Sequence, residues 1–136
     1  MTNRKFLPIA LALLGGAASC HGETPDDAFR GFVAAILAHR QDDAWAHLSA
    51  ASQAAMKAAR DNAAALAPKG TVPDDPKALL FGEDVGLARP IDKIEVVSQS
   101  GSRARLSVEA GGEKHEVQMV REDGRWKLDL TYGLKL

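Results

Sequence analysis

The stretch RARLSVEAGGEKHEVQMVREDGRWKLDL, residues 103–130, decides the fold of this chain. Apolar and polar residues alternate along it with a period of two, and glycines interrupt the alternation at Gly111, Gly112 and Gly124. Such alternation is typical of β-strands with one buried face, and glycine supplies the positive φ that tight hairpins need. The stretch therefore predicts consecutive antiparallel strands, each with an apolar and a polar face.

One more strand is expected just before this stretch. From Ile91 onward, Ile94 and Val96 alternate with charged residues, and the turn sequence Ser100-Gly101-Ser102 follows. The spacing predicts a meander of about four strands in total.

The chain before residue 91 follows a helical period instead. Thr24-Pro25-Asp26-Asp27 combines a threonine cap, proline at the first helical position and acids at the positive end of the helix dipole. The apolar residues that follow recur at i, i+3, i+4, i+7 and i+8, and they are Phe29, Phe32, Val33, Ile36 and Leu37. This pattern predicts a first helix with one face directed into a core.

Two more helices are expected after it. A cap at Asp42 predicts a short helix that carries Trp45 and reaches about Leu48, and a cap at Ser49 predicts a longer, alanine-rich helix through Leu66. Prolines and glycines then interrupt residues 67–90, where Asp75-Pro76 predicts one helical turn. A sheet with one apolar face must be covered, so we expect an α+β domain with N-terminal helices packed on a curved antiparallel sheet.

The N-terminus has the layout of a signal peptide. Arg4 and Lys5 precede an apolar run that ends at Leu14, too short to span a bilayer, which takes about 20 apolar residues. Ala17-Ala18-Ser19-Cys20 resembles a bacterial lipobox, in which the signal is cut before a cysteine whose sulfur carries lipid. We therefore expect a signal peptide over residues 1–19, a lipidated tether over 20–23 and a single domain over 24–136.

Lipid on Cys20 would make a membrane the first partner of the protein. Several acyl chains hold a protein to a bilayer where one chain alone is marginal. In lipoproteins of bacteria with two membranes, His21 in place of aspartate after the cysteine favours the periplasmic side of the outer membrane. The alternative reading of these residues is an ordinary small-residue cleavage site beside an incidental thiol.

Composition narrows the remaining classes of function. The 136 residues carry a net charge of −1, and loss of Arg4 and Lys5 with the signal would make the rest more acidic, which argues against nucleic acid as a partner. Cys20 is the only cysteine, so no internal disulfide can form. No cofactor motif or metal-ligand spacing is present, since His39 and His47 are not spaced to share one helical face.

The order of elements resembles the nuclear transport factor 2-like superfamily, and more narrowly its small bacterial lipoproteins of unassigned function. The resemblance is carried by the capped first helix, the short helix with Trp45, the long polar helix and the closing strands with Glu122-Asp123-Gly124-Arg125-Trp126-Lys127-Leu128. It implies a cone in which a curved sheet wraps the helices and leaves a pocket. The superfamily includes isomerases and cyclases as well as pure binding modules, so the resemblance does not choose a function.

The strand and helix phases suggest which side chains would line that pocket. They are Phe32, Ile36, Trp45, His115, Trp126 and Tyr132. His115 is in phase with Val117 and is expected to point inward, where its imidazole would suit a general base, although no carboxylate is expected beside it. Boundary and core packing are the competing readings for His115 and Tyr132.

These observations favour a membrane-anchored binding or assembly domain without chemistry, acting on a small apolar ligand or an envelope protein. An isomerase or cyclase that uses His115 with Tyr132, and a structural component of an envelope complex, are the alternatives. The charged outer face of the sheet favours a monomer over the dimers that are common in the superfamily.

Overall fold

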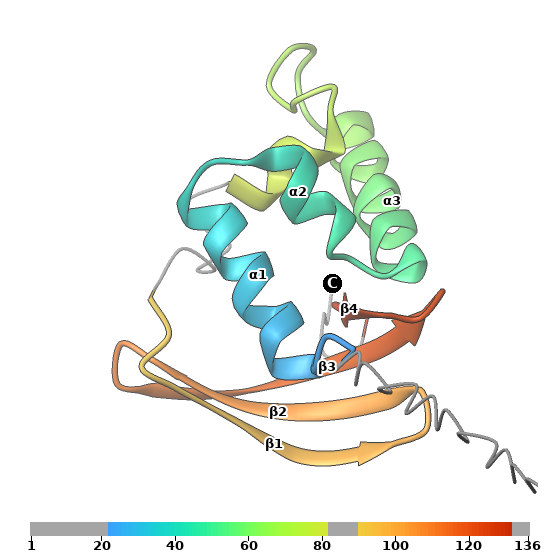
Figure 1. Cartoon of the computed structure of the whole chain (residues 1–136). Coiled ribbons are helices and arrows are strands. Elements are labelled where there is room, and N and C mark those ends of the chain that lie inside the picture. The colour runs from blue at the N-terminus through green and yellow to red at the C-terminus, as the bar shows by residue number, and fades with distance from the viewer. Residues whose placement is uncertain (1–21, 82–89, 132–136) are drawn as a thin grey trace, which may run out of the picture.

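The computed structural model describes residues 22–81 and 90–131 (Figure 1). The helices come first: α1 (Pro25–Leu37), α2 (Gln41–Ala46), α3 (Ala50–Leu66) and the 3₁₀ helix η1 (Pro76–Phe81). Four strands follow: β1 (Lys93–Ser100), β2 (Arg103–Ala110), β3 (Glu113–Glu122) and β4 (Arg125–Asp129). They form one antiparallel sheet in the order β1-β2-β3-β4. The expected α+β fold, with helices preceding a four-stranded antiparallel sheet, is confirmed.

Two of the three predicted helix caps are confirmed. The Thr24 hydroxyl accepts a hydrogen bond from the Asp27 amide at 3.4 Å, and the Ser49 hydroxyl accepts one from the Ser52 amide at 3.1 Å. The predicted cap at Asp42 is wrong, because α2 already begins at Gln41. The Asp42 carboxylate lies 2.8 Å from the Lys77 ammonium and so pairs across to η1 instead of capping its own helix.

One hydrophobic core joins the helical and the strand halves of the chain. α1 contacts β1, β2 and β4, and the helices lie on one side of the sheet (Figure 1). Phe32 of α1 and Leu106 of β2 are fully buried, and Leu128 of β4 belongs to the same cluster. Alternate residues of β2 supply the buried side chains Ala104, Leu106 and Val108, as the period of two predicted.

The segment that links α2 to α3 closes the outer edge of β4. Leu48 forms a parallel bridge with Leu128, whose amide donates to the His47 carbonyl at 2.7 Å. The Leu128 carbonyl accepts from the Ser49 amide at 2.9 Å and from the Ser52 hydroxyl at 3.2 Å. The end strand therefore has hydrogen-bond partners on both sides.

Ser52 is the most connected side chain at this junction, and it is fully buried. Its oxygen accepts from the Leu130 amide at 2.7 Å and lies 2.7 Å from the Ser49 hydroxyl. Since a hydroxyl has one hydrogen and that of Ser52 goes to the Leu128 carbonyl, the Ser49 hydroxyl donates to Ser52.

Nearby, the Glu122 carboxylate accepts from the Ala50 amide at 3.1 Å and sits at the positive end of α3.

Truncating Leu106 should destabilise the domain far more than the same change at an exposed site. Leu106→Ala removes a fully buried side chain and should lower the free energy of unfolding by about 2–5 kcal/mol. The control is Leu66→Ala, because Leu66 is 90% exposed and alanine suits a helix. Urea unfolding measures both variants, and similar losses would contradict the assigned core.

Ser52→Ala should lower the free energy of unfolding by about 1–3 kcal/mol, since it leaves the buried Ser49 hydroxyl and the half-buried Leu130 amide without their partner. Ser98→Ala removes a hydroxyl on exposed β1 and should change the free energy of unfolding by no more than about 0.5 kcal/mol. Urea unfolding measures both serine variants. Equal losses in the free energy of unfolding would contradict the hydrogen bonds assigned to Ser52.

Candidate functional site

Four of the side chains expected to line a pocket come together in the core. Phe32, Ile36 and Trp126 have exposed fractions of 0%, 2% and 3%, and Trp45 packs against them partly buried. They come from α1, α2 and β4, and they pack within a single apolar cluster. Tyr132, the predicted lipidation site Cys20 and the predicted signal peptide lie outside the described residues.

His115 does not join them. It pairs with the buried Val108 and so faces the helical side of the sheet, but its side chain is 60% exposed. His115 therefore has the inward phase of its strand but lies at the boundary of the sheet, because β3 runs on past the end of β4, whose pairing with β3 begins at Gln118. A strand position is buried only where a neighbouring element also covers it.

A carboxylate lies next to His115, where the sequence predicted none. The Glu113 Oε2 atom lies 3.3 Å from the His115 Nε2 atom, and both side chains are more than half exposed. The two-residue spacing of Glu113 and His115 could have predicted this contact, because residues two apart on a strand point to the same face. The exposure of both side chains weakens the electrostatic interaction between them.

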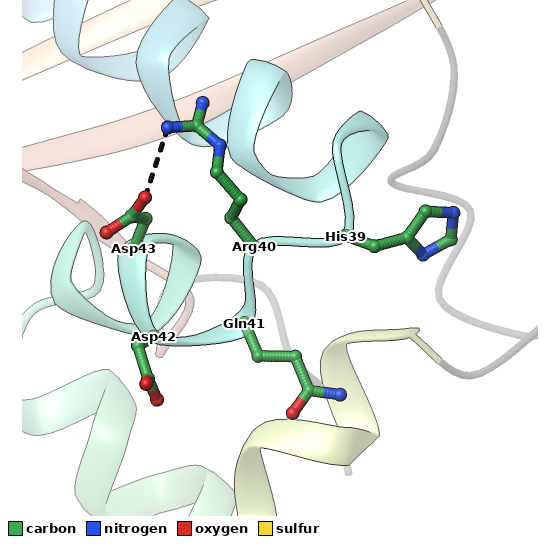
Figure 2. Close-up of a pocket in the computed structure, with 5 residues that line it drawn as sticks. All are labelled: His39, Arg40, Gln41, Asp42 and Asp43. Atoms are coloured by element: carbon green, nitrogen blue, oxygen red, sulfur yellow. Dashed lines mark hydrogen bonds and ion pairs between the residues drawn. The ribbon is translucent and has the colours of Figure 1, made fainter.

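A polar hollow of about 420 Å³ lies at the turn between α1 and α2 and is lined by His39, Arg40, Gln41, Asp42 and Asp43 (Figure 2). The Arg40 guanidinium pairs with Asp43 at 3.1 Å, and each of these side chains is 56% exposed. The hydrogen bond and the negative charge of Asp42 raise the pKa of Lys77. Each carboxylate of the hollow thus has a cationic partner beside it, Arg40 for Asp43 and Lys77 for Asp42.

A smaller hollow, of about 60 Å³, lies where the described chain begins. It is lined by Glu23, Ala46, His47, Arg125, Trp126 and Lys127. The Lys127 ammonium donates to the Ala46 carbonyl, and His47 Nδ1 lies 2.7 Å from the Asp43 carbonyl oxygen. His47 also packs on α1, where its Nε2 would lie 2.9 Å from a Cβ at Gly31, so a larger residue there would force the His47 ring to move. The Lys127 contact holds the end of α2 against β4.

The two edges of the sheet differ. The β4 edge is covered by residues 47–49, whereas no strand within residues 22–81 and 90–131 pairs with the outer edge of β1, which we call the open edge. Val96 and Val97 on β1 are 41% and 53% exposed, and a register shift between Val96 and Ser98 interrupts the pairing with β2. A strand that has one unpaired edge and exposed valines is a template for binding an extended segment.

The open edge carries one ion pair, in which the Lys93 ammonium lies 3.0 Å from the Glu95 carboxylate. The hydrogen bond and the charge of Glu95 raise the pKa of Lys93. The same contacts lower the pKa of Glu95. At neutral pH the edge therefore presents a fixed pair of opposite charges beside its valines.

The described part of the chain, residues 22–81 and 90–131, shows neither a metal-binding cluster nor a membrane-spanning helix. Within it, no three side chains of histidine, cysteine, aspartate or glutamate gather closely enough to hold a metal ion. None of its helices has the length and the hydropathy that are needed to cross a bilayer.

Comparison of the chain with protein-family models, curated proteins and solved structures finds no match. The function must therefore be inferred from the sequence and the structure of the chain itself.

The Glu95 carboxyl should titrate below its ordinary pKa of 4.5, and replacing Lys93 with methionine should bring the pKa back toward that value. Because the folded-state pKa is lowered, the stabilisation is present above the unfolded-state pKa and is lost as the pH falls through the folded-state pKa. Because the Glu95 side chain is exposed, its ion pair contributes little to the free energy of unfolding. Side-chain NMR titration measures the effect, with Lys57→Met as a distant control that should leave Glu95 unchanged.

Proposed function

We propose that this protein is a lipoprotein, held in the cell envelope by lipid on Cys20, whose domain binds or assembles with another envelope component without catalysing a reaction. The sequence supports the periplasmic side of the outer membrane as its location. The cone-shaped arrangement of the nuclear transport factor 2-like superfamily belongs to this proposal.

The observation that carries the proposal is the contrast between the two sheet edges. A domain that buries one edge under residues 47–49 leaves the other with exposed Val96 and Val97. The best fit to such an edge is an extended segment of an envelope protein, because its backbone would satisfy the edge amides and carbonyls while its apolar side chains cover the valines. Packing of Phe32, Ile36 and Trp126 into a shared core supports a surface role over an interior one.

The isomerase or cyclase alternative gains one observation from the structure. Glu113 supplies the carboxylate that a histidine base at His115 would use for orientation. Both groups are more than half exposed, and an enzyme of this kind needs an enclosed site in which charge is weakly screened. The binding proposal is therefore the better supported of the two.

A photo-crosslinking residue placed at Val97 should capture a single envelope protein in intact cells, and one placed at Lys57 on α3 should not. Val96→Lys puts a charge on the open edge and should reduce the Val97 product, while Lys57→Met should leave it unchanged. Mass spectrometry of the product identifies the captured peptide. Equal products at both positions, or no product at Val97, would contradict binding at the open edge.

A further inference from the structure

The start of the described chain lies at one corner of the sheet. Glu23 lines the smaller hollow with Arg125 and Lys127, at the beginning of β4. The Ser102 carbonyl accepts a hydrogen bond from the Arg121 amide at 2.7 Å, so the turn between β1 and β2 lies at the same corner. We call the surface of Glu23, Ser102, Arg121 and Arg125 the anchor corner.

The length of the tether limits how far this corner can be from a membrane. Three residue steps separate Cys20 from Glu23, and they span at most about 11 Å when fully extended. A small domain is about 30 Å across, so a tether of this length cannot present every face to the lipid equally. If Cys20 carries acyl chains, as the proposed function requires, the anchor corner is held near the headgroups.

The charges at this corner suit a phosphate-rich surface. Four cations gather there, namely Arg103, Arg121, Arg125 and Lys127, beside four acids, namely Glu23, Glu122, Asp123 and Asp129. Two of these acids already have partners: Glu122 accepts from the Ala50 amide, and Asp129 accepts from Thr131 with 11% of its side chain exposed. Arg103 lies 3.9 Å from the Asp129 carboxylate and is 69% exposed, and Arg121 and Arg125 are exposed as well.

We infer that the anchor corner rests on the headgroup phosphates of an anionic bilayer, with Arg121 and Arg125 directed at the lipid. Guanidinium groups fit this partner because their paired N–H donors match phosphate oxygens. The loop between α3 and η1, at the top of Figure 1 while the sheet lies at the bottom, then points away from the membrane. The open edge of β1 stands beside the membrane, accessible to a partner. This orientation rests on the proposed lipid anchor.

Because Cys20 is the only cysteine and its sulfur would be acylated, a cysteine introduced elsewhere is the only thiol that a probe can label. We would label Ser102→Cys and, as a distant control, Lys69→Cys in the full, membrane-extracted protein. Each is reconstituted into vesicles of phosphatidylcholine mixed equally with phosphatidylglycerol that carry a headgroup nitroxide quencher. The Ser102 probe should be quenched severalfold more strongly than the Lys69 probe.

The intact mass separates the two ways in which this experiment can fail. A protein that carries acyl chains but shows equal quenching at both positions overturns the orientation and leaves the anchor standing. A protein with an unmodified Cys20 overturns the anchor, and the orientation falls with it.

A second arm tests the role of the arginines. Arg121→Glu with Arg125→Glu should lower quenching of the Ser102 probe, while Lys57→Glu with Lys69→Glu makes the same change in net charge on the far side and should not. In vesicles of phosphatidylcholine alone the difference should shrink, since the zwitterionic surface attracts the arginines less. An equal effect of the two double variants would show that net charge, and not this corner, faces the lipid.

Discussion

The structure depends on the backbone of Leu128, which uses both of its polar groups on the link between α2 and α3. Its amide donates to His47, and its carbonyl accepts from Ser49 and Ser52. These bonds are the point where the helical half of the chain is tied to the sheet, while burial of Phe32 and its neighbours supplies the larger stabilisation. The bonds fix where α3 begins, and the burial fixes how α1 lies on the sheet.

This junction also makes the sheet asymmetric. Once residues 47–49 occupy the β4 edge, the chain has no described segment beside β1, and Val96 and Val97 are left exposed. The proposed tether enters the domain near β4 as well, through Glu23. The β4 edge of the sheet is thus committed to internal contacts, and the outer edge of β1 is the one that the described residues leave open.

Local pattern predicted the elements of this fold well, because their causes are local. The period of two in β2 and the caps at Thr24 and Ser49 act within a few residues. What the sequence did not reveal depends on contacts between distant segments. Asp42 pairs with Lys77 rather than capping α2, and His115 has the inward phase but is left exposed by the described segments around it. No local rule reports where a neighbouring element ends.

Contacts with distant segments also hold α3 in place. Its alanine-rich sequence offers little to bury, Ser52 is its only fully buried residue, and Leu66 at its end is 90% exposed. Burial alone therefore cannot fix it, and polar contacts do so instead. Ser52 and Glu122 bind its first turn to the strands, and Arg60 donates to the Pro73 carbonyl at 3.0 Å and pairs with Asp74. A helix held this way is stabilised by a few directional bonds at its first turn, so the loss of one buried hydroxyl there should matter more than the loss of apolar surface elsewhere along it.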